Sequence, residues 1–205
     1  MLEFILTVLL LELTPGPNMA YLATLTLDRG RRAGLLATAG VAAGLSVHAV
    51  VAALGLGVLI SKAPLFYDVL CWTGVAYILF LAWETWQSDG KETRRPDLTG
   101  SASGPLFWRG FLSNVFNPKS IIFFVSVIPG FVRDDMSESG LLLQIARLGA
   151  IYVAIATAIH AAIVLLAGRL RPFLMSGGRH KPVRRTLALA LVLVAAWLAW
   201  TTRRT

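Results

Sequence analysis

Long apolar stretches fill most of this chain, and short polar segments rich in Arg and Lys separate them. A helix needs about 20 mostly apolar residues to cross a bilayer. The stretches that approach this length are Glu3–Leu27, Ala33–Ile60, Leu65–Gln87, Trp108–Val132, Leu141–Gly168 and Thr186–Thr201. This pattern predicts an all-α integral membrane protein with six transmembrane helices, folded as a single transmembrane domain over residues 1–205.

The composition agrees with a membrane protein. Hydrophobic residues make up 56% of the chain and charged residues only 15%, whereas a soluble domain carries about 25% charged residues. The net charge of +8 would suit nucleic acid if the basic residues were interleaved with aromatic residues on one face. They lie instead in the gaps between apolar stretches, so we expect the lipid bilayer as a partner and no nucleic acid.

The basic residues also predict an orientation. The first, third and fifth gaps hold Arg29, Arg31, Arg32, Lys91, Arg94, Arg95, Arg109, Arg169, Arg171, Arg179, Lys181, Arg184 and Arg185. The second gap holds only Lys62, and the fourth only Arg133. Because cytoplasmic loops carry an excess of Lys and Arg, loops 1, 3 and 5 are predicted to face the cytoplasm.

Proline interrupts two of the predicted helices. The run Thr14-Pro15-Gly16-Pro17-Asn18 lies inside the first, and Asn117-Pro118-Lys119 lies inside the fourth. Each proline removes a backbone donor and clashes with the preceding turn. In hydrocarbon, the freed backbone groups must be buried in protein or face a water-filled cavity. Broken helices at corresponding places in two halves are typical of the binding site of a transporter.

A polar linker divides the chain into two halves of three helices each. The predicted organisation is repeat one over 1–87, a cytoplasmic linker over 88–106, and repeat two over 107–205. An odd number of helices per half gives the halves opposite orientations, which is a 3+3 inverted repeat with proline-broken helices 1 and 4. The run Val47-His48-Ala49 in the second helix, echoed by Ile159-His160-Ala161 in the fifth, supports this interpretation.

The residues at the two breaks are the candidate binding residues. A half-helix that starts near Asn18 directs its free backbone N–H groups into the gap and can hold an anion such as the carboxylate of an amino acid. The predicted substrate-binding residues are Thr14, Pro15, Gly16, Pro17, Asn18, Asn114, Asn117, Pro118 and Lys119. The alternatives are a simple proline kink that shapes packing, and a Lys119 side chain that extends to the membrane interface.

Two ionisable residues inside the apolar stretches are candidates for proton coupling. Glu12 directly precedes the first break, and an acid within a membrane helix suggests a function. His48 titrates near neutral pH in its unperturbed form, although a histidine hydrogen-bonded within a bundle is an alternative, as it is for His160. Gly40 and Gly44 lie on the same stripe as His48 and are predicted to let another helix approach closely.

Several kinds of chemistry have little support in the sequence. No G-x-x-x-x-G-K-[ST] motif occurs, so direct ATP drive is not expected. We expect no cofactor, no resident metal and no catalytic residues. A metal-ion or other small-metabolite carrier of similar fold remains an alternative. An intramembrane hydrolase is a remote one, since only Ser46 with His160 could form its nucleophile and base.

At this point the chain resembles the LysE/RhtB family of bacterial amino-acid exporters. The resemblance rests on the segments 13–19, 29–35, 53–57, 74–83, 107–114 and 117–119, together with Gly40, Gly44 and His48. It implies an inner-membrane carrier, not an enzyme, that exports amino acids or close derivatives by proton antiport, with a homodimer as a plausible assembly. Glu12 departs from the residues expected at its position in most members.

Overall fold

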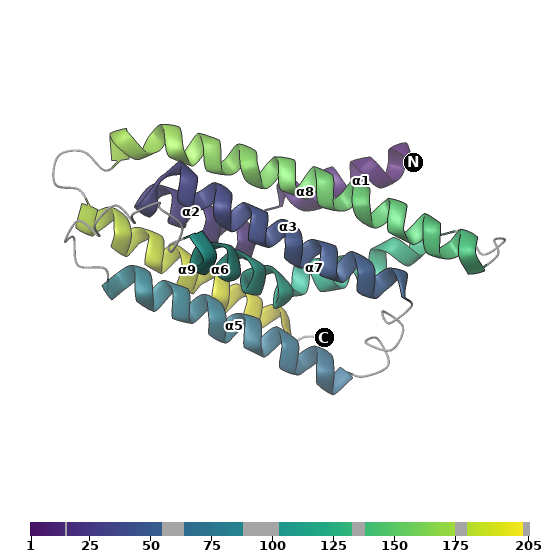
Figure 1. The fold of residues 1–205 in the computed structure, drawn as a ribbon. Helices are drawn as coiled ribbons and strands as arrows, with labels where there is room; N and C mark the ends of the chain where they lie inside the picture. Colours follow the sequence, from purple (N-terminus) through teal and green to yellow (C-terminus); the bar gives the residue numbers. More distant parts are fainter. Residues whose placement is uncertain (15, 55–63, 88–102, 133–137, 175–179, 203–205) are drawn as a thin grey trace.

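The computed structural model describes residues 1–14, 16–54, 64–87, 103–132, 138–174 and 180–202, and within these residues it contains helices and no strands. Figure 1 shows the helices. Their bounds are α1 Leu2–Leu13, α2 Pro17–Arg29, α3 Arg31–Ala53, α5 Pro64–Gln87, α6 Ser103–Val115, α7 Pro118–Ile122, the π-helix η1 Phe123–Val127, the 3₁₀-helix η2 Ile128–Phe131, α8 Glu138–Leu174 and α9 His180–Thr202.

Both predicted interruptions are present. Helix α1 ends at Leu13 and α2 begins at Pro17, and the axes of the two differ by 54°. Helix α6 ends at Val115 and is followed by Pro118, with a bend of 51°. Pro17 and Pro118 stand at the first positions of α2 and α7. A missing N–H at this position removes no hydrogen bond within the helix. Pro15 lies outside the described residues.

Three helices extend beyond an end of their apolar stretches. Helix α6 begins at Ser103 instead of Trp108, and α9 begins at His180 instead of Thr186. Helix α8 extends over 37 residues and continues past Gly168 through Pro172 to Leu174. Hydropathy finds only the apolar part of a helix, so polar turns that extend each end are missed. Helix α3 ends at Ala53, and the predicted continuation to Ile60 falls mainly outside the described residues.

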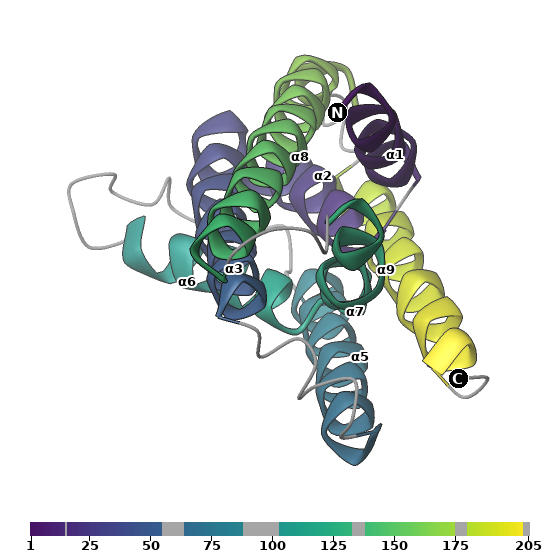
Figure 2. The ribbon, with the colours of Figure 1, turned by 90° about the vertical axis from the view of Figure 1, so that its right-hand side faces the viewer.

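The chain runs back and forth along one long axis (Figure 1), and the view along the bundle shows how the helices group (Figure 2). Helix α3 packs against α6 and α8, and α5 packs against α9. Helices α1 and α2 both pack against α8. The junction of α2 and α3 lies at the same end of the bundle as the last turns of α8, and both chain termini lie toward the other end (Figure 1).

The apolar helices are of a length that suits a membrane. Among the described residues, Arg31–Ala53 and Ser139–Leu174 are each long and apolar enough to cross one. The bent pairs Leu2–Leu13 with Pro17–Arg29 and Gly104–Val115 with Pro118–Phe131 would add two more spans if each pair crosses as one unit. A shorter apolar stretch, Arg185–Ala196, lies within α9.

Glycines bring α3 and α6 close together. A Cβ atom added to Gly40 would collide with the Phe107 carbonyl oxygen, and one added to Gly110 would collide with the Ala37 carbonyl oxygen. A Cβ on Gly44 would lie 2.9 Å from the Asn114 Cβ. The backbones of α3 and α6 are therefore in direct contact, as glycines permit in membrane helices.

One arginine joins the far ends of α2 and α8. Arg171 Nε donates to the Leu27 carbonyl at 3.1 Å, and its Nη2 donates to the Asp28 carbonyl at 3.2 Å. The last carbonyls of a helix have no partner within the helix. Arg171 thus supplies donors to the final turn of α2.

Candidate functional site

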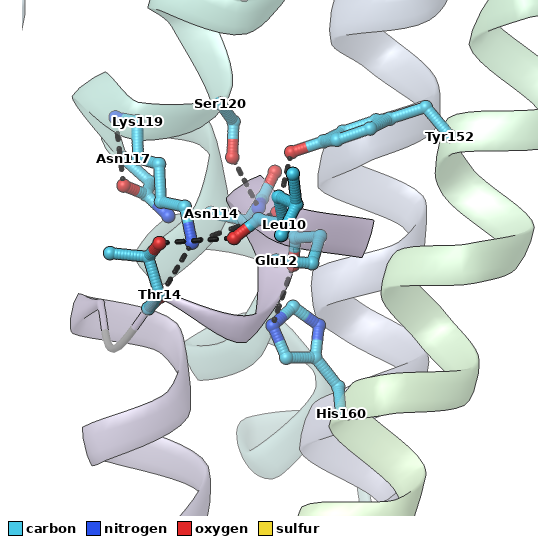
Figure 3. Close-up of polar contacts among 9 residues, drawn as sticks. All are labelled: Leu10, Glu12, Thr14, Asn114, Asn117, Lys119, Ser120, Tyr152 and His160. Carbon is cyan, nitrogen blue, oxygen red and sulfur yellow. Dashed lines mark hydrogen bonds and ion pairs between the residues drawn. The ribbon is translucent and has the colours of Figure 1, made fainter. Parts of the chain in front are cut away.

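The two helix breaks meet around the buried carboxylate of Glu12, which is only 3% exposed near the end of α1. Tyr152 Oη donates to Glu12 Oε1 at 3.0 Å. Lys119 Nζ lies 3.8 Å from the same oxygen, and His160 Nε2 lies 3.6 Å from Oε2. These groups converge from α7 and α8 (Figure 3). A buried carboxylate needs such partners, because an isolated charge is costly to remove from water.

Lys119 connects the second break to the first. Its Nζ donates to the Thr14 carbonyl at 2.9 Å, at the point where α1 ends. Its stem passes over Gly16, where an added Cβ would lie 3.3 Å from the Lys119 Cδ. The ammonium therefore points toward the first break (Figure 3).

Amide side chains hold the backbone at the breaks. Asn117 caps α7, since its Oδ1 accepts from the Lys119 backbone N–H at 3.1 Å. Asn18 Oδ1 accepts a hydrogen bond of 3.1 Å from Ser113 Oγ, which ties the start of α2 to α6. Capping by an Asn side chain satisfies a donor that the helix leaves free, so Asn117 has a structural task in this form.

Asn114 lies fully buried beside the same region. Its Nδ2 donates to Ser120 Oγ at 3.2 Å, and its Oδ1 has no hydrogen-bond partner among the described residues. A buried amide oxygen without a partner is uncommon. It marks a place where a water or a ligand donor would be favourable.

A small cavity lies between these groups. Its volume is about 10 Å³, and its walls are formed by Glu12, Gly16, Asn18, Met19, Leu45, Asn117, Lys119, Ser120, Tyr152 and His160. Such a volume holds about one water molecule. An amino acid does not fit, so the structure is a closed form in which the polar groups contact one another.

Aromatic packing fixes the Tyr152 hydroxyl. The Tyr152 ring stacks on Phe123 with centroids 4.0 Å apart and meets Phe124 edge-on at 5.2 Å. Both phenylalanines belong to the π-helix η1. π-Helical turns occur frequently at functional sites. Here the wider turn follows α7 directly and places the two rings against α8.

His48 lies at the other break. Its Nε2 is 3.3 Å from the Val115 carbonyl at the end of α6, and its ring centroid is 6.0 Å from that of Phe124. His160 is the histidine that contacts Glu12. Each histidine therefore meets the end of the broken helix in the opposite half of the chain.

The structure brings together most of the predicted site residues. Those that line the cavity or contact its charged groups are Glu12, Thr14, Gly16, Asn18, Asn117 and Lys119. Pro17 and Pro118 are buried at the starts of α2 and α7. Sequence reasoning missed Tyr152, Ser113 and Ser120. Tyr152 stands two helical turns before His160, and this spacing could have indicated a shared face of the helix.

The described residues can be compared with two of the alternative chemistries, hydrolysis and metal binding. Ser46 is exposed, and its hydroxyl donates to the Ala42 carbonyl at 2.8 Å within its own helix. In the described part of the chain, no group of three His, Cys, Asp or Glu residues lies close enough to hold a metal ion.

Comparison with known proteins shows what the chain is similar to. The family model of LysE-type translocators matches residues 9–202. The homoserine/homoserine lactone efflux protein of Salmonella typhimurium is 29% identical over 196 residues, which cover 96% of this chain and 94% of that protein. The threonine efflux protein of Escherichia coli K12 is 28% identical over 68% of this chain and 71% of its own length. No solved structure matches the chain.

Proposed function

This chain belongs to the LysE-type translocator family, and we propose that it exports amino acids or close derivatives across the bacterial inner membrane by proton antiport. Relatives named for homoserine and threonine efflux favour small polar amino acids as cargo. The observation that carries the proposal is the pair formed by the buried Glu12 and the half-buried Lys119, opposite charges 3.8 Å apart at the junction of two broken helices. The chain is a carrier and not an enzyme.

The proposed membrane arrangement is six spans in a 3+3 inverted repeat, with loops 1, 3 and 5 in the cytoplasm. A two-fold axis in the membrane would pair α3 with α8 and α5 with α9, and both of these pairs pack together. The same axis would relate the contact between His160 and Glu12 to the contact between His48 and Val115. A homodimer is compatible with this arrangement.

The cargo carboxylate is proposed to bind at the start of α2, where free N–H groups and the helix dipole favour an anion. The residues assigned to the binding region are Thr14, Pro15, Gly16, Pro17, Asn18, Asn114, Asn117, Pro118 and Lys119. Among the described residues that line the cavity, Glu12 is the only one with a carboxylate, and it is the proposed partner of the cargo ammonium. Gly40 and Gly44 support the site by holding α6 against α3.

The coupled proton is proposed to move through Glu12. Of the two histidines considered, His160 lies 3.6 Å from the Glu12 carboxylate. His48 instead contacts the Val115 carbonyl. This geometry favours His160 as the partner of Glu12. His48 is the histidine that lies at the second break.

Uptake of labelled amino acids into inverted membrane vesicles tests the proposal. Vesicles containing the protein should accumulate threonine or homoserine when an imposed proton gradient drives antiport, and vesicles without it should not. The Asn18→Ala variant, which loses the tie between α2 and α6, should accumulate less. Absence of uptake over a full amino-acid panel, with the protein inserted and folded, would exclude the amino-acid assignment.

A further inference from the structure

Two charged side chains from different helices face each other at the cavity. Glu12 comes from α1 and Lys119 from α7, and their charged atoms are 3.8 Å apart. An α-amino acid carries the same two charges on groups that are attached to one carbon atom. The two opposite charges of Glu12 and Lys119 sum to zero. A bound zwitterion is also neutral overall, so it leaves the total charge of the site unchanged.

We propose that Lys119 is the residue that selects cargo with a free carboxylate. In this proposal, which rests on the proposed function, the cargo ammonium replaces Lys119 at the Glu12 carboxylate and the cargo carboxylate binds the released Lys119 ammonium. Amino-acid esters and amides lack the carboxylate charge. They would leave the Lys119 charge uncompensated and are therefore poorer cargo.

Contacts of the carboxylate support this exchange. Glu12 Oε1 faces both Tyr152 and Lys119, while Oε2 faces His160. A cargo ammonium that takes the place of Lys119 leaves the hydrogen bond from Tyr152 intact. The carboxylate is 4% exposed at its side chain, so it stays in position while its partner changes.

The contacts of Lys119 show why it is the mobile half. Its side chain is 20% exposed, and its Nζ is held by the backbone carbonyl of Thr14 at 2.9 Å. A lysine ammonium is a compact charge with three donors on a flexible stem. It can keep the bond to Thr14 and direct another donor to an incoming carboxylate.

Charge balance then predicts the specificity. A zwitterion between Glu12 and Lys119 gives a neutral set of charges, whereas an esterified amino acid gives a net positive set in a buried place. A buried charge that is left without a partner is unfavourable. Removing the Lys119 charge reverses the preference between the two cargoes. The esterified amino acid then pairs with Glu12 alone, whereas the zwitterion brings a carboxylate that has no partner.

The test is a ratio of two cargoes measured in the same proteoliposomes. Purified full-length protein is assayed by counterflow with threonine and with threonine methyl ester. The wild type should prefer threonine. Lys119→Met keeps the length of the stem over Gly16, and it should shift the ratio toward the ester by roughly tenfold or more, the effect of a lost hydrogen bond to a charged group. Lys119→Arg should keep the preference for threonine.

Matched variants separate the possible outcomes. Arg147→Met removes an exposed positive charge that does not line the cavity and should leave the ratio unchanged, while Glu12→Gln should lower transport of both cargoes. Equal loss of threonine and ester in Lys119→Met would overturn the proposal, as would a wild type that prefers the ester. If the wild type moves neither cargo, the proposed function itself fails. Should Lys119→Met not fold, Lys119→Gln is expected to show the same shift.

Discussion

His160 Nε2 lies 3.6 Å from Glu12 Oε2, although the two residues belong to opposite halves of the chain. Both side chains are about 3% exposed. The His160 ring meets the carboxylate through one nitrogen, while the other nitrogen, Nδ1, is buried without a hydrogen-bond partner among the described residues.

The contact between His160 and Glu12 predicts that proton coupling can be lost while cargo binding is kept. His160→Asn should weaken accumulation of cargo driven by a proton gradient, while exchange of labelled for unlabelled cargo without a gradient continues. The reason is that exchange needs the binding groups but no net proton transfer. Uptake and exchange are measured in the same proteoliposomes.

His48→Asn is the matched control for that experiment, since it changes the corresponding histidine in the first half. It removes the contact with the Val115 carbonyl and does not touch Glu12. We expect its gradient-driven uptake to decrease less than that of His160→Asn. The opposite order would assign the coupling role to His48.

The Tyr152 hydroxyl predicts a second result. Tyr152→Phe removes the donor to Glu12 Oε1 and keeps the ring that stacks on Phe123. A hydrogen bond to a charged group contributes about 1.5–3 kcal/mol, so transport should decrease by roughly tenfold or more. Tyr77→Phe also removes a hydroxyl, one that donates to the Arg109 carbonyl at 3.2 Å, and should affect transport less. Initial rates of uptake at equal protein content provide the comparison.

The contact between α3 and α6 predicts an effect on stability. Gly40→Ala would push a methyl group into the Phe107 carbonyl oxygen, and overpacking of this kind costs about 1–3 kcal/mol. Gly104→Ala in α6 is the control, because nothing lies within 4 Å of its added Cβ. The thermal unfolding temperature in detergent should fall for Gly40→Ala and stay the same or rise for Gly104→Ala. Equal unfolding temperatures for Gly40→Ala and the wild type would show that α3 and α6 can move apart without a loss of stability.

Gly16 predicts a fourth result at the first break. The Cβ of Gly16→Ala would lie 3.3 Å from the Lys119 Cδ, so the lysine stem has to shift and its bond to the Thr14 carbonyl weakens. Cargo affinity should fall, though less than in Lys119→Met, while the amount of folded protein remains similar. Gly130→Ala has open space around its Cβ and should bind cargo as the wild type does. Apparent affinities from competition uptake would decide between these outcomes.

The helix breaks and the polar residues around them were predictable because proline acts locally. Pro17 and Pro118 start new helices for reasons contained in a few neighbouring residues. The contact of Tyr152 with Glu12 joins positions 140 residues apart, and no local pattern indicates which face of α8 meets α1. The same limit applies to the choice between His48 and His160, since both look alike in sequence and only the packing of α8 against α1 distinguishes them.

Arg171 has a mechanical consequence for the closed form. Its guanidinium holds the Leu27 and Asp28 carbonyls at the end of α2. The same α2 carries Asn18 into one wall of the cavity, and α8 carries Tyr152 and His160 into another. Any movement that parts these two walls at the arginine-rich end has to break both bonds of one side chain. Arg171 therefore fastens the two walls to each other at that end of the bundle.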